Sequence, residues 1–218
     1  MSRYLIHACP NRMWYVNEFL VPSMKAQGIK SEEIIIYNDE QKLGNLEAYL
    51  DSAKLVMNEP GSTWHLQDDI LISSNFRQIT DYYDVFQIVC GFCNTYSISS
   101  PGFGPAVKMW YSFPCMLIAN SILKDFTEWM RTPEVQNNFK PYIDAKKFDD
   151  SFFRYFLIKE KPNTVIFNLA PNIVENVDYL LGGSLANTGR DVNMDINSRC
   201  FEEPELVELL KLELAQRQ

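Results

Sequence analysis

Two adjacent carboxylates, Asp68 and Asp69, stand between two apolar-rich runs of the chain. The run 63–66 is typical of a buried strand, and the run 70–72 is again apolar. Paired acids at the end of a buried strand are costly unless something positive lies against them. A divalent cation that also binds a diphosphate would be such a partner. A strand-end turn whose acids cap the helix expected near residues 73–75 explains the pattern equally well.

The elements that would position these acids alternate along the first half of the chain. Hydrophobic spacing and turn residues predict strands and helices in this order: strand 3–8, helix 13–27, strand 33–37, helix 45–58 and strand 63–66. The β-branched run in 33–37 indicates a strand buried on both faces. This alternation predicts a parallel sheet with right-handed crossovers, and such sheets bind ligands beyond the carboxyl ends of their strands.

Polar or reactive residues follow each of the three expected strand ends, and we expect them to face one crevice. They are His7, Ala8, Arg12, Asp39, Asn45, Gln67 and Asp68. Arg12 has the donors to neutralise phosphates, although a surface arginine is nearly as good an interpretation. Asp39 contacts a ligand or bonds its own turn, and Asn45 lies near the ligand or caps the following helix. The two histidines of the chain, His7 and His65, are more often core or hydrogen-bonded residues than ligands.

The second half of the chain is less regular. We expect strands at 85–90, 106–110 and 165–168, and helices at 75–81, 115–130, 149–159 and 204–216. These elements complete a single mixed α/β domain over residues 1–218, with a mostly parallel central sheet flanked by helices and an irregular C-terminal part.

Composition argues against several functional classes. The net charge is −8 and no Lys/Arg-rich run occurs, which disfavours a tight grip on a nucleic-acid duplex. No apolar stretch has the length of a membrane span. The five cysteines show no framework spacing, and the pair at 90 and 93 lacks the context of a redox or zinc motif. We therefore expect free thiols in a cytoplasmic protein.

The order of these features resembles the glycosyltransferases of the GT-A fold. Arg12 follows the first strand, Asp39 ends the second, Gly44 and Asn45 open a helix, and the segment 64–73 carries the paired acids. The pattern is most similar to small transferase-like proteins of bacteria and phages, related to lipooligosaccharide-type galactosyltransferases. The resemblance implies one GT-A-like domain, with a nucleotide-sugar-binding half at 1–125 and an acceptor-side half at 126–218.

The resemblance also implies a metal and a donor site. Asp69 would bind Mn²⁺ or Mg²⁺, and Asp68 would contact the donor ribose or the metal. Asn176 or Asp178 stands where the family often has a histidine ligand, and an amide oxygen or carboxylate can replace it. Gly183 and Ser184 would belong to a small-residue loop over the diphosphate.

Catalysis would need a base that takes the proton of the acceptor hydroxyl. Asp149 and Asp150 open an expected helix and resemble the acid near the family's acceptor site. Acids at a helix N-terminus also satisfy free amides and the helix dipole, which is the simpler interpretation. Trp110 and Tyr111 would stack on a sugar, or would hold a helix in place.

The expected function is transfer of a sugar from a nucleotide-sugar, a UDP-sugar by preference, to a hydroxyl of a glycan, a protein or a modified base in phage DNA. A non-catalytic protein that binds a nucleotide or a partner on the same fold is the alternative. Nucleotidyl transfer is a third hypothesis, but it needs a glycine- and lysine-rich phosphate loop that residues 9–12 do not resemble. The sequence does not determine the oligomeric state.

Overall fold

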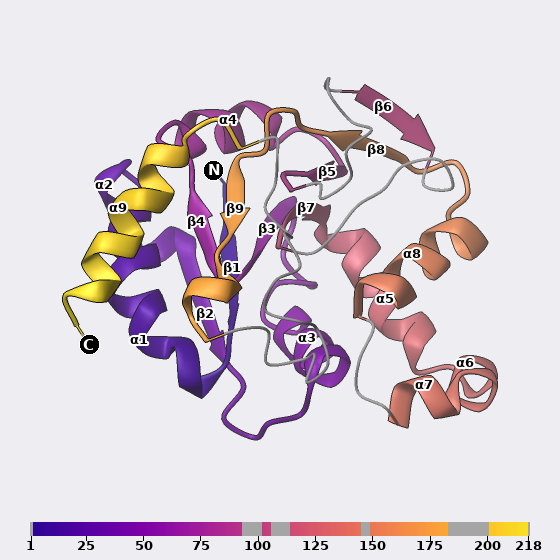
Figure 1. The fold of residues 1–218 in the computed structure, drawn as a ribbon. Helices are drawn as coiled ribbons and strands as arrows, with labels where there is room; N and C mark the ends of the chain where they lie inside the picture. The colour runs from indigo at the N-terminus through magenta and orange to yellow at the C-terminus, as the bar shows by residue number, and fades with distance from the viewer. Residues whose placement is uncertain (1, 93–101, 106–113, 145–148, 183–200, 218) are drawn as a thin grey trace.

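The protein is a mixed α/β domain built on one large sheet and one small sheet (Figure 1). The computed structural model describes residues 2–92, 102–105, 114–144, 149–182 and 201–217. The strands are β1 (Tyr4–Ala8), β2 (Ile34–Asn38), β3 (Ser62–Gln67), β4 (Ile70–Ile72), β5 (Ile88–Cys90), β6 (Gly102–Pro105), β7 (Cys115–Ala119), β8 (Val165–Asn168) and β9 (Val174–Asn176).

Nine α-helical segments are assigned within these described ranges. They are α1 (Met13–Tyr15), α2 (Val21–Ala26), α3 (Asn45–Ala53), α4 (Phe76–Tyr83), α5 (Asn120–Met130), α6 (Pro133–Asn138), α7 (Lys140–Asp144), α8 (Asp149–Glu160) and α9 (Pro204–Ala215). A π-helical stretch, Val16–Leu20, joins α1 to α2 without a break. Within the described ranges, no helix has the length and hydrophobicity that crossing a membrane requires.

The large sheet has the order β2-β1-β3-β7-β5-β8-β6. β1 pairs in parallel with β2 and β3, and β5 pairs in parallel with β8. β7 lies antiparallel to both β3 and β5, so these two strands share one direction. Five of the seven strands therefore run the same way, and β7 and β6 run against them. This confirms the predicted mostly parallel central sheet.

The first two crossovers lie on opposite faces of this sheet. The helical stretch α1–α2 follows β1, and its Tyr15, Leu20 and Met24 pack in one core with Ile6 and Trp64. Helix α3 follows β2, and its residues pack in the other core, which also contains Leu5 and residues of α5 and α8. Because the chain winds to β2 on one side of β1 and to β3 on the other, β1 and β3 form a topological switch point.

β2 differs from the prediction of a fully buried strand. Four of its five residues are partly buried, and the fifth, Ile36, is 36% exposed. β2 is the terminal strand of the sheet and pairs with β1 alone. The isoleucine run therefore indicates a strand but not a central one, because edge strands and central strands use the same residue types.

The helix predicted for residues 115–130 is wrong in its first part. Cys115–Ala119 is the strand β7, every residue of which is buried between β3 and β5. The helix α5 begins only at Asn120, whose side chain accepts a hydrogen bond from the Thr63 hydroxyl and donates one to the Glu59 carbonyl. The strand predicted at 106–110 lies outside the described residues.

A small second sheet lies close to the carboxyl end of β3. β4 follows β3 after the two-residue turn at Asp68 and Asp69, and it pairs antiparallel with β9. The Tyr15 hydroxyl donates to the Ile70 carbonyl at 2.9 Å, which fastens the start of β4 to α1. The terminal helix α9 lies along the same side of the molecule as α1 and α2 (Figure 1). The paired acids therefore stand where the chain leaves the large sheet for the small one.

Candidate functional site

Arg12 lies directly against the two paired acids. Its Nη1 atom is 3.2 Å from Asp68 Oδ1 and 2.6 Å from Asp69 Oδ2. The three side chains are only 6 to 11% exposed. Pro10 starts a short 3-10 turn after β1, and the Arg12 amide donates to the Cys9 carbonyl at 3.0 Å. This turn places the guanidinium at the switch point between β1 and β3, so the positive partner that the acids require is supplied by the chain itself.

Three of the four carboxylate oxygens of the pair are engaged. Arg12 contacts one oxygen of each acid, and the Cys9 amide donates to Asp68 Oδ2 at 2.8 Å. The fourth oxygen, Asp69 Oδ1, is buried and has no hydrogen-bond partner among the residues that the structure describes. A buried carboxylate oxygen without a partner is costly, which makes this atom a candidate ligand atom of the site.

Asp178 adds a third carboxylate, whose charge acts on Asp69. The Val177 amide donates to the Asp69 carbonyl at 2.7 Å, so Asp178 follows directly after a contact with the pair. Asp178 is only 9% exposed, and its amide donates to Asn176 Oδ1 at 3.1 Å. Burial first, and then the charges of Asp68 and Asp178, raise the pKa of Asp69 to about 6 against the opposing effect of Arg12. The site thus has more negative charge than Arg12 neutralises.

The chemistry of this donor set fits a divalent cation in part. Asp69 Oδ1 and the Asp178 carboxylate are oxygen ligands of the kind that Mg²⁺ and Mn²⁺ prefer, and their excess negative charge favours a cation. Across the described residues, no three His, Cys, Asp or Glu side chains are grouped so as to hold a metal ion. A cation at this place would therefore need further oxygen ligands from water or from a substrate.

Comparisons with known proteins do not assign a family. No family model matches the chain, and no curated protein matches it. Among solved structures, the chain is similar to A197 from STIV, with a TM-score of 0.41 and 12% identity over 79% of this chain and 83% of that chain. At this similarity A197 supports no argument about function, so the site has to be interpreted from its own geometry.

Asp39 and Asn45, which are predicted to lie near a bound nucleotide, occupy the same edge of the sheet. Asp39 accepts hydrogen bonds from the amides of Leu43 and Gly44 at 2.9 and 3.4 Å, which is the turn-bonding interpretation of this acid. Asn45 is the first residue of α3 and does not cap it, because Gly44, at φ 87°, occupies the N-cap position. The interpretation of Asn45 as a helix cap is therefore wrong. The interpretation of Asp68 and Asp69 as caps of a helix near residues 73–75 is also wrong, because these acids bind Arg12 and the Cys9 amide instead.

The two histidines form a hydrogen-bonded pair between neighbouring strands. His7 Nε2 lies 3.0 Å from His65 Nδ1, and His7 Nδ1 lies 2.9 Å from the Ser52 hydroxyl. The Ser52 hydroxyl also donates to the Tyr49 carbonyl, so His7 Nδ1 is the donor to Ser52 and His7 Nε2 accepts from His65. Burial lowers the pKa of His7 to about 3 and that of His65 well below its ordinary value. The pair is thus neutral and supports the sheet.

The histidine pair predicts that the protein becomes less stable as the pH falls. Between pH 3 and 6.5 the unfolded chain binds protons at His7 and His65 that the folded protein excludes, so the free energy of unfolding falls as the pH falls. In that pH window, each histidine changes the free energy of unfolding by up to about 1.4 kcal/mol per pH unit. The raised pKa of Asp69 has the opposite effect on stability and offsets the contribution of one histidine, because the folded protein binds a proton at Asp69 at a higher pH than the unfolded chain does. Urea unfolding from pH 7 to 4 measures the slope. The double variant His7→Asn/His65→Asn should flatten or reverse it, and an unchanged slope contradicts this origin.

Ala8 and Gln67 join neighbouring strands at the same edge through their main-chain groups. Ala8 is buried, and its carbonyl accepts from the Asp39 amide at 2.9 Å, which joins the ends of β1 and β2. The Gln67 amide donates to the Pro114 carbonyl at 3.1 Å, which joins β3 to the start of β7. Gly183, Ser184, Trp110 and Tyr111 lie outside the described residues.

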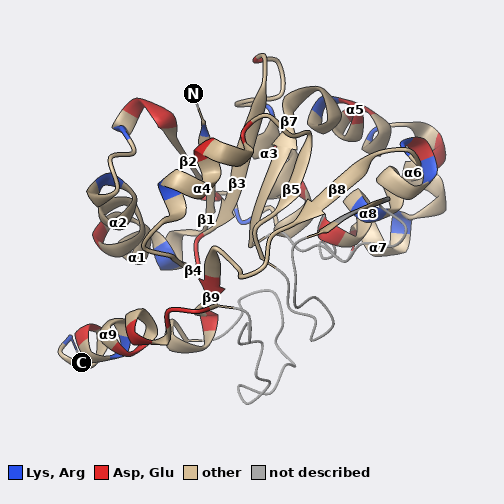
Figure 2. Ribbon diagram, turned by 90° about the horizontal axis from the view of Figure 1, so that it is seen from above, with Lys and Arg blue, Asp and Glu red and all other residues tan. Residues whose placement is uncertain are grey.

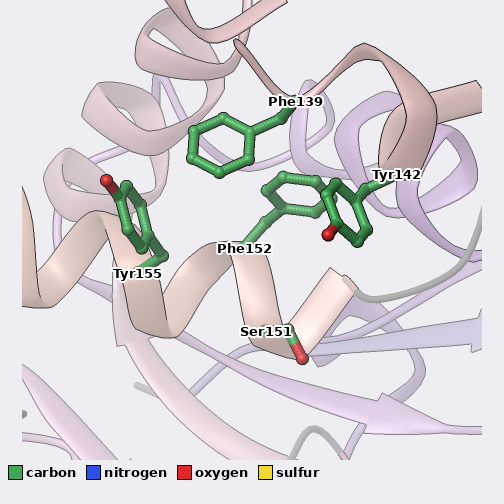
Figure 3. A pocket seen from close by; sticks show the side chains of 5 residues that line it. All are labelled: Phe139, Tyr142, Ser151, Phe152 and Tyr155. Carbon is green, nitrogen blue, oxygen red and sulfur yellow. The ribbon is translucent and has the colours of Figure 1, made fainter.

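Asp149 and Asp150, which the resemblance predicts near an acceptor, open α8. The backbone of Asp149 begins this helix, and the Ser151 hydroxyl donates to Asp150 Oδ1 at 3.3 Å. The chain runs along α5 toward the carboxyl edge of the sheet and returns along α8 to β8, which places the start of α8 on the same edge as the paired acids. A cavity of about 300 Å³ lies beside it, lined by Phe139, Tyr142, Ser151, Phe152 and Tyr155 (Figure 3). Sequence reasoning missed this cavity, because its rings come from α8, from α7 and from the residue between α6 and α7.

Proposed function

We propose that this protein is a glycosyltransferase that moves a sugar from a nucleotide-sugar, by preference a UDP-sugar, to a hydroxyl acceptor with the help of Mn²⁺ or Mg²⁺. The observation that carries the proposal is the position of the site. Arg12, Asp68 and Asp69 meet beyond the carboxyl ends of β1 and β3, at the switch point where open α/β sheets bind ligands, and the charge of Asp178 acts on Asp69.

Each donor-side residue has a defined role in this proposal. Asp69 Oδ1 and Asp178 would hold the cation, whose chemistry is to offset the charge of the leaving diphosphate. Arg12 and the Cys9 amide fix the orientation of the two acids through the contacts they make with three of the carboxylate oxygens. Asp39, His7, Ala8 and Asn45 would line the nucleoside side of the same edge.

The acceptor-side residues supply a proton acceptor and an aromatic wall. Asp150 would take the proton of the acceptor hydroxyl if the reaction inverts. Tyr142 and Tyr155, which are 57% and 43% exposed, flank the cavity beside it (Figure 3). Aromatic faces suit the apolar face of a sugar ring, which favours a glycan acceptor over a protein or a DNA base. The basic residues drawn in Figure 2 are spread over several elements rather than along one band, which also gives little support to a DNA acceptor.

A second candidate is a non-catalytic protein that binds a nucleotide on the same fold. The ion pairs of Arg12 with Asp68 and Asp69 favour it, because they stabilise the acids without any ligand. In this case nucleotides bind, but no sugar is released from any donor.

A donor panel tests the two candidates. We expect UDP-sugars with Mn²⁺ to raise the melting temperature of the wild-type protein and to be slowly hydrolysed, whereas Asp69→Asn should lose most of the shift. Asp81→Asn is the matched control, because Asp81 is an acid paired with Arg77 elsewhere in the molecule. If no donor raises the melting temperature and none is cleaved, the transferase proposal fails. If donors bind without cleavage, the binding protein is correct. Equal shifts in Asp69→Asn and Asp81→Asn place the site elsewhere.

A further inference from the structure

The cavity beside the start of α8 is bounded by aromatic rings that hold one another in place. Phe139 meets Phe152 and Tyr155 edge to face, with ring centroids 5.7 and 5.1 Å apart and interplanar angles of 89° and 68°. Trp129 also packs against Tyr155, at 6.0 Å. Edge-to-face contacts are a preferred geometry of aromatic pairs, so these contacts fix the position of the half-exposed Tyr155 ring. The wall of the cavity is therefore formed before any ligand binds (Figure 3).

The wall consists mostly of carbon. Of the five side chains that the structure describes around the cavity, none is charged, and only Tyr142, Ser151 and Tyr155 have polar atoms. The Ser151 hydroxyl already donates to Asp150 Oδ1. A sugar ring inside the cavity would lose water from several hydroxyls and find few partners for them, which costs free energy. An uncharged apolar group loses no hydrogen bonds there, so the neutral wall suits such a group.

The size of the cavity fits a single ring. Its volume is about 300 Å³. An apolar cavity of about 150 Å³ is already large enough to bind benzene. A phenyl-sized group with a short substituent therefore has room, whereas a long acyl chain would leave most of its length outside. Tyr142 and Tyr155 lie on opposite sides of this space in Figure 3, where their exposed rings can flank the rest of a ligand.

Ser151 connects the cavity to the proposed base, because it lines the cavity and also donates to Asp150. We propose that the cavity binds an uncharged, ring-sized apolar group of the acceptor and that the acceptor hydroxyl lies on the side of Asp150. The inference rests on the proposed function and adds the acceptor class to it: a glycoside whose aglycone is apolar. The aglycone packs against Phe139 and Phe152, and the sugar stays at the exposed mouth.

Two glucosides that differ only in the aglycone give the first measurement. Phenyl β-glucoside and methyl β-glucoside are titrated into the wild-type protein without a donor, by calorimetry. We expect the phenyl compound to bind about tenfold more tightly, because its ring leaves water on entering the cavity. Saturation-transfer NMR should show the strongest contact at the phenyl protons. Equal affinity for the two glucosides, or no binding of either, overturns the inference.

Variants of the cavity give the second measurement. Tyr155→Ala and Tyr142→Ala should each lose most of the preference for the phenyl compound, because each removes one side of the cavity. Tyr82→Ala is the matched control, since Tyr82 is a tyrosine of α4 that is 72% exposed and does not line the cavity, and it should keep the preference. If Tyr155→Ala does not fold, Tyr142→Ala decides, because Tyr142 is the more exposed of the two. Wild-type affinity for phenyl β-glucoside in both cavity variants overturns the inference.

Failure of the proposed function has a different signature. In that case phenyl β-glucoside binds and depends on Tyr142 and Tyr155, but no UDP-sugar is cleaved or transferred in its presence. The cavity then keeps its class of ligand, and only the reaction is lost. If sugar is transferred equally well to the methyl and the phenyl glucoside, and the two bind equally, the inference fails while the proposed function stands.

Discussion

Replacing Arg12 by methionine should lower the free energy of unfolding by about 3–5 kcal/mol at pH 7, the usual cost of breaking a buried ion pair by removing one partner. The change leaves Asp68 and Asp69 buried, adjacent and uncompensated, with Asp178 close by. Methionine replaces much of the apolar stem of arginine, so the loss reports the charge more than the packing. Urea unfolding followed by circular dichroism gives the value.

The pH dependence of this loss identifies its cause. Burial already raises the pKa of Asp69 to about 6 against the opposing effect of Arg12, so removing Arg12 raises the folded-state pKa of Asp69 further. The destabilisation is then complete above this raised pKa and shrinks as the pH falls toward 4, because the folded variant binds a proton that the unfolded chain does not. The triple variant Arg12→Met/Asp68→Asn/Asp69→Asn should recover most of the loss at pH 7.

Arg77→Met is the control for this prediction. Arg77 also pairs with two acids, but only one of them is buried: Glu33 is 2% exposed and keeps a hydrogen bond from the Lys30 amide, whereas Asp81 is 44% exposed and screened by water. Its loss should be clearly smaller. Equal losses in the two methionine variants, or an Arg12→Met loss that does not change with pH, would mean that the paired acids do not depend on Arg12.

The requirement for a positive partner could be predicted from Asp68 and Asp69 alone, but the identity of that partner could not. Arg12 lies 56 and 57 positions away from the two acids in the sequence, and we assigned it to a substrate phosphate. The two segments meet only because the α1–α2 stretch and α3 cover opposite faces of the sheet. A strand periodicity does not reveal which face a crossover takes.

Sheet neighbours also decided the elements that sequence reasoning misplaced. Cys115–Ala119 is apolar and follows a proline, which suits the first turn of a helix as well as a strand, and pairing with β3 and β5 settles it as a strand. β9 is three residues long and pairs with β4, so no periodicity could show it, although it leads to Asp178. Local patterns predicted the strands β1, β3 and β8 because each has enough residues to show its hydrophobic character.

Asparagine in place of Asp150 should lower the rate of sugar transfer by about 10²–10⁴-fold, the usual contribution of a positioned general base. Under the proposed function Asp150 receives the acceptor proton, and an amide cannot do so. Asp150 is partly buried at the start of α8 and accepts a hydrogen bond from the Ser151 hydroxyl. An amide oxygen can accept the same bond, so the change should cost little stability. Donor binding, measured by calorimetry with UDP, should not change, because the proposed donor residues lie at the ends of β1, β2 and β3 and in the segments that follow β1, β2, β3 and β9, not on α8.

Two further variants separate a base from a structural acid. Asp144→Asn on α7 is the matched control, since Asp144 is exposed and pairs with Lys140 at the same edge of the molecule, and its transfer rate should stay near that of the wild type. Asp149→Asn tests the neighbouring acid, and if it carries the loss instead, the base is Asp149. A pH profile of transfer completes the argument: the acid limb of the wild-type rate should disappear in the variant that lacks the base. If Asp150→Asn and Asp149→Asn both transfer sugar at the wild-type rate, the two acids serve only the N-terminus of α8, and the proton acceptor lies elsewhere.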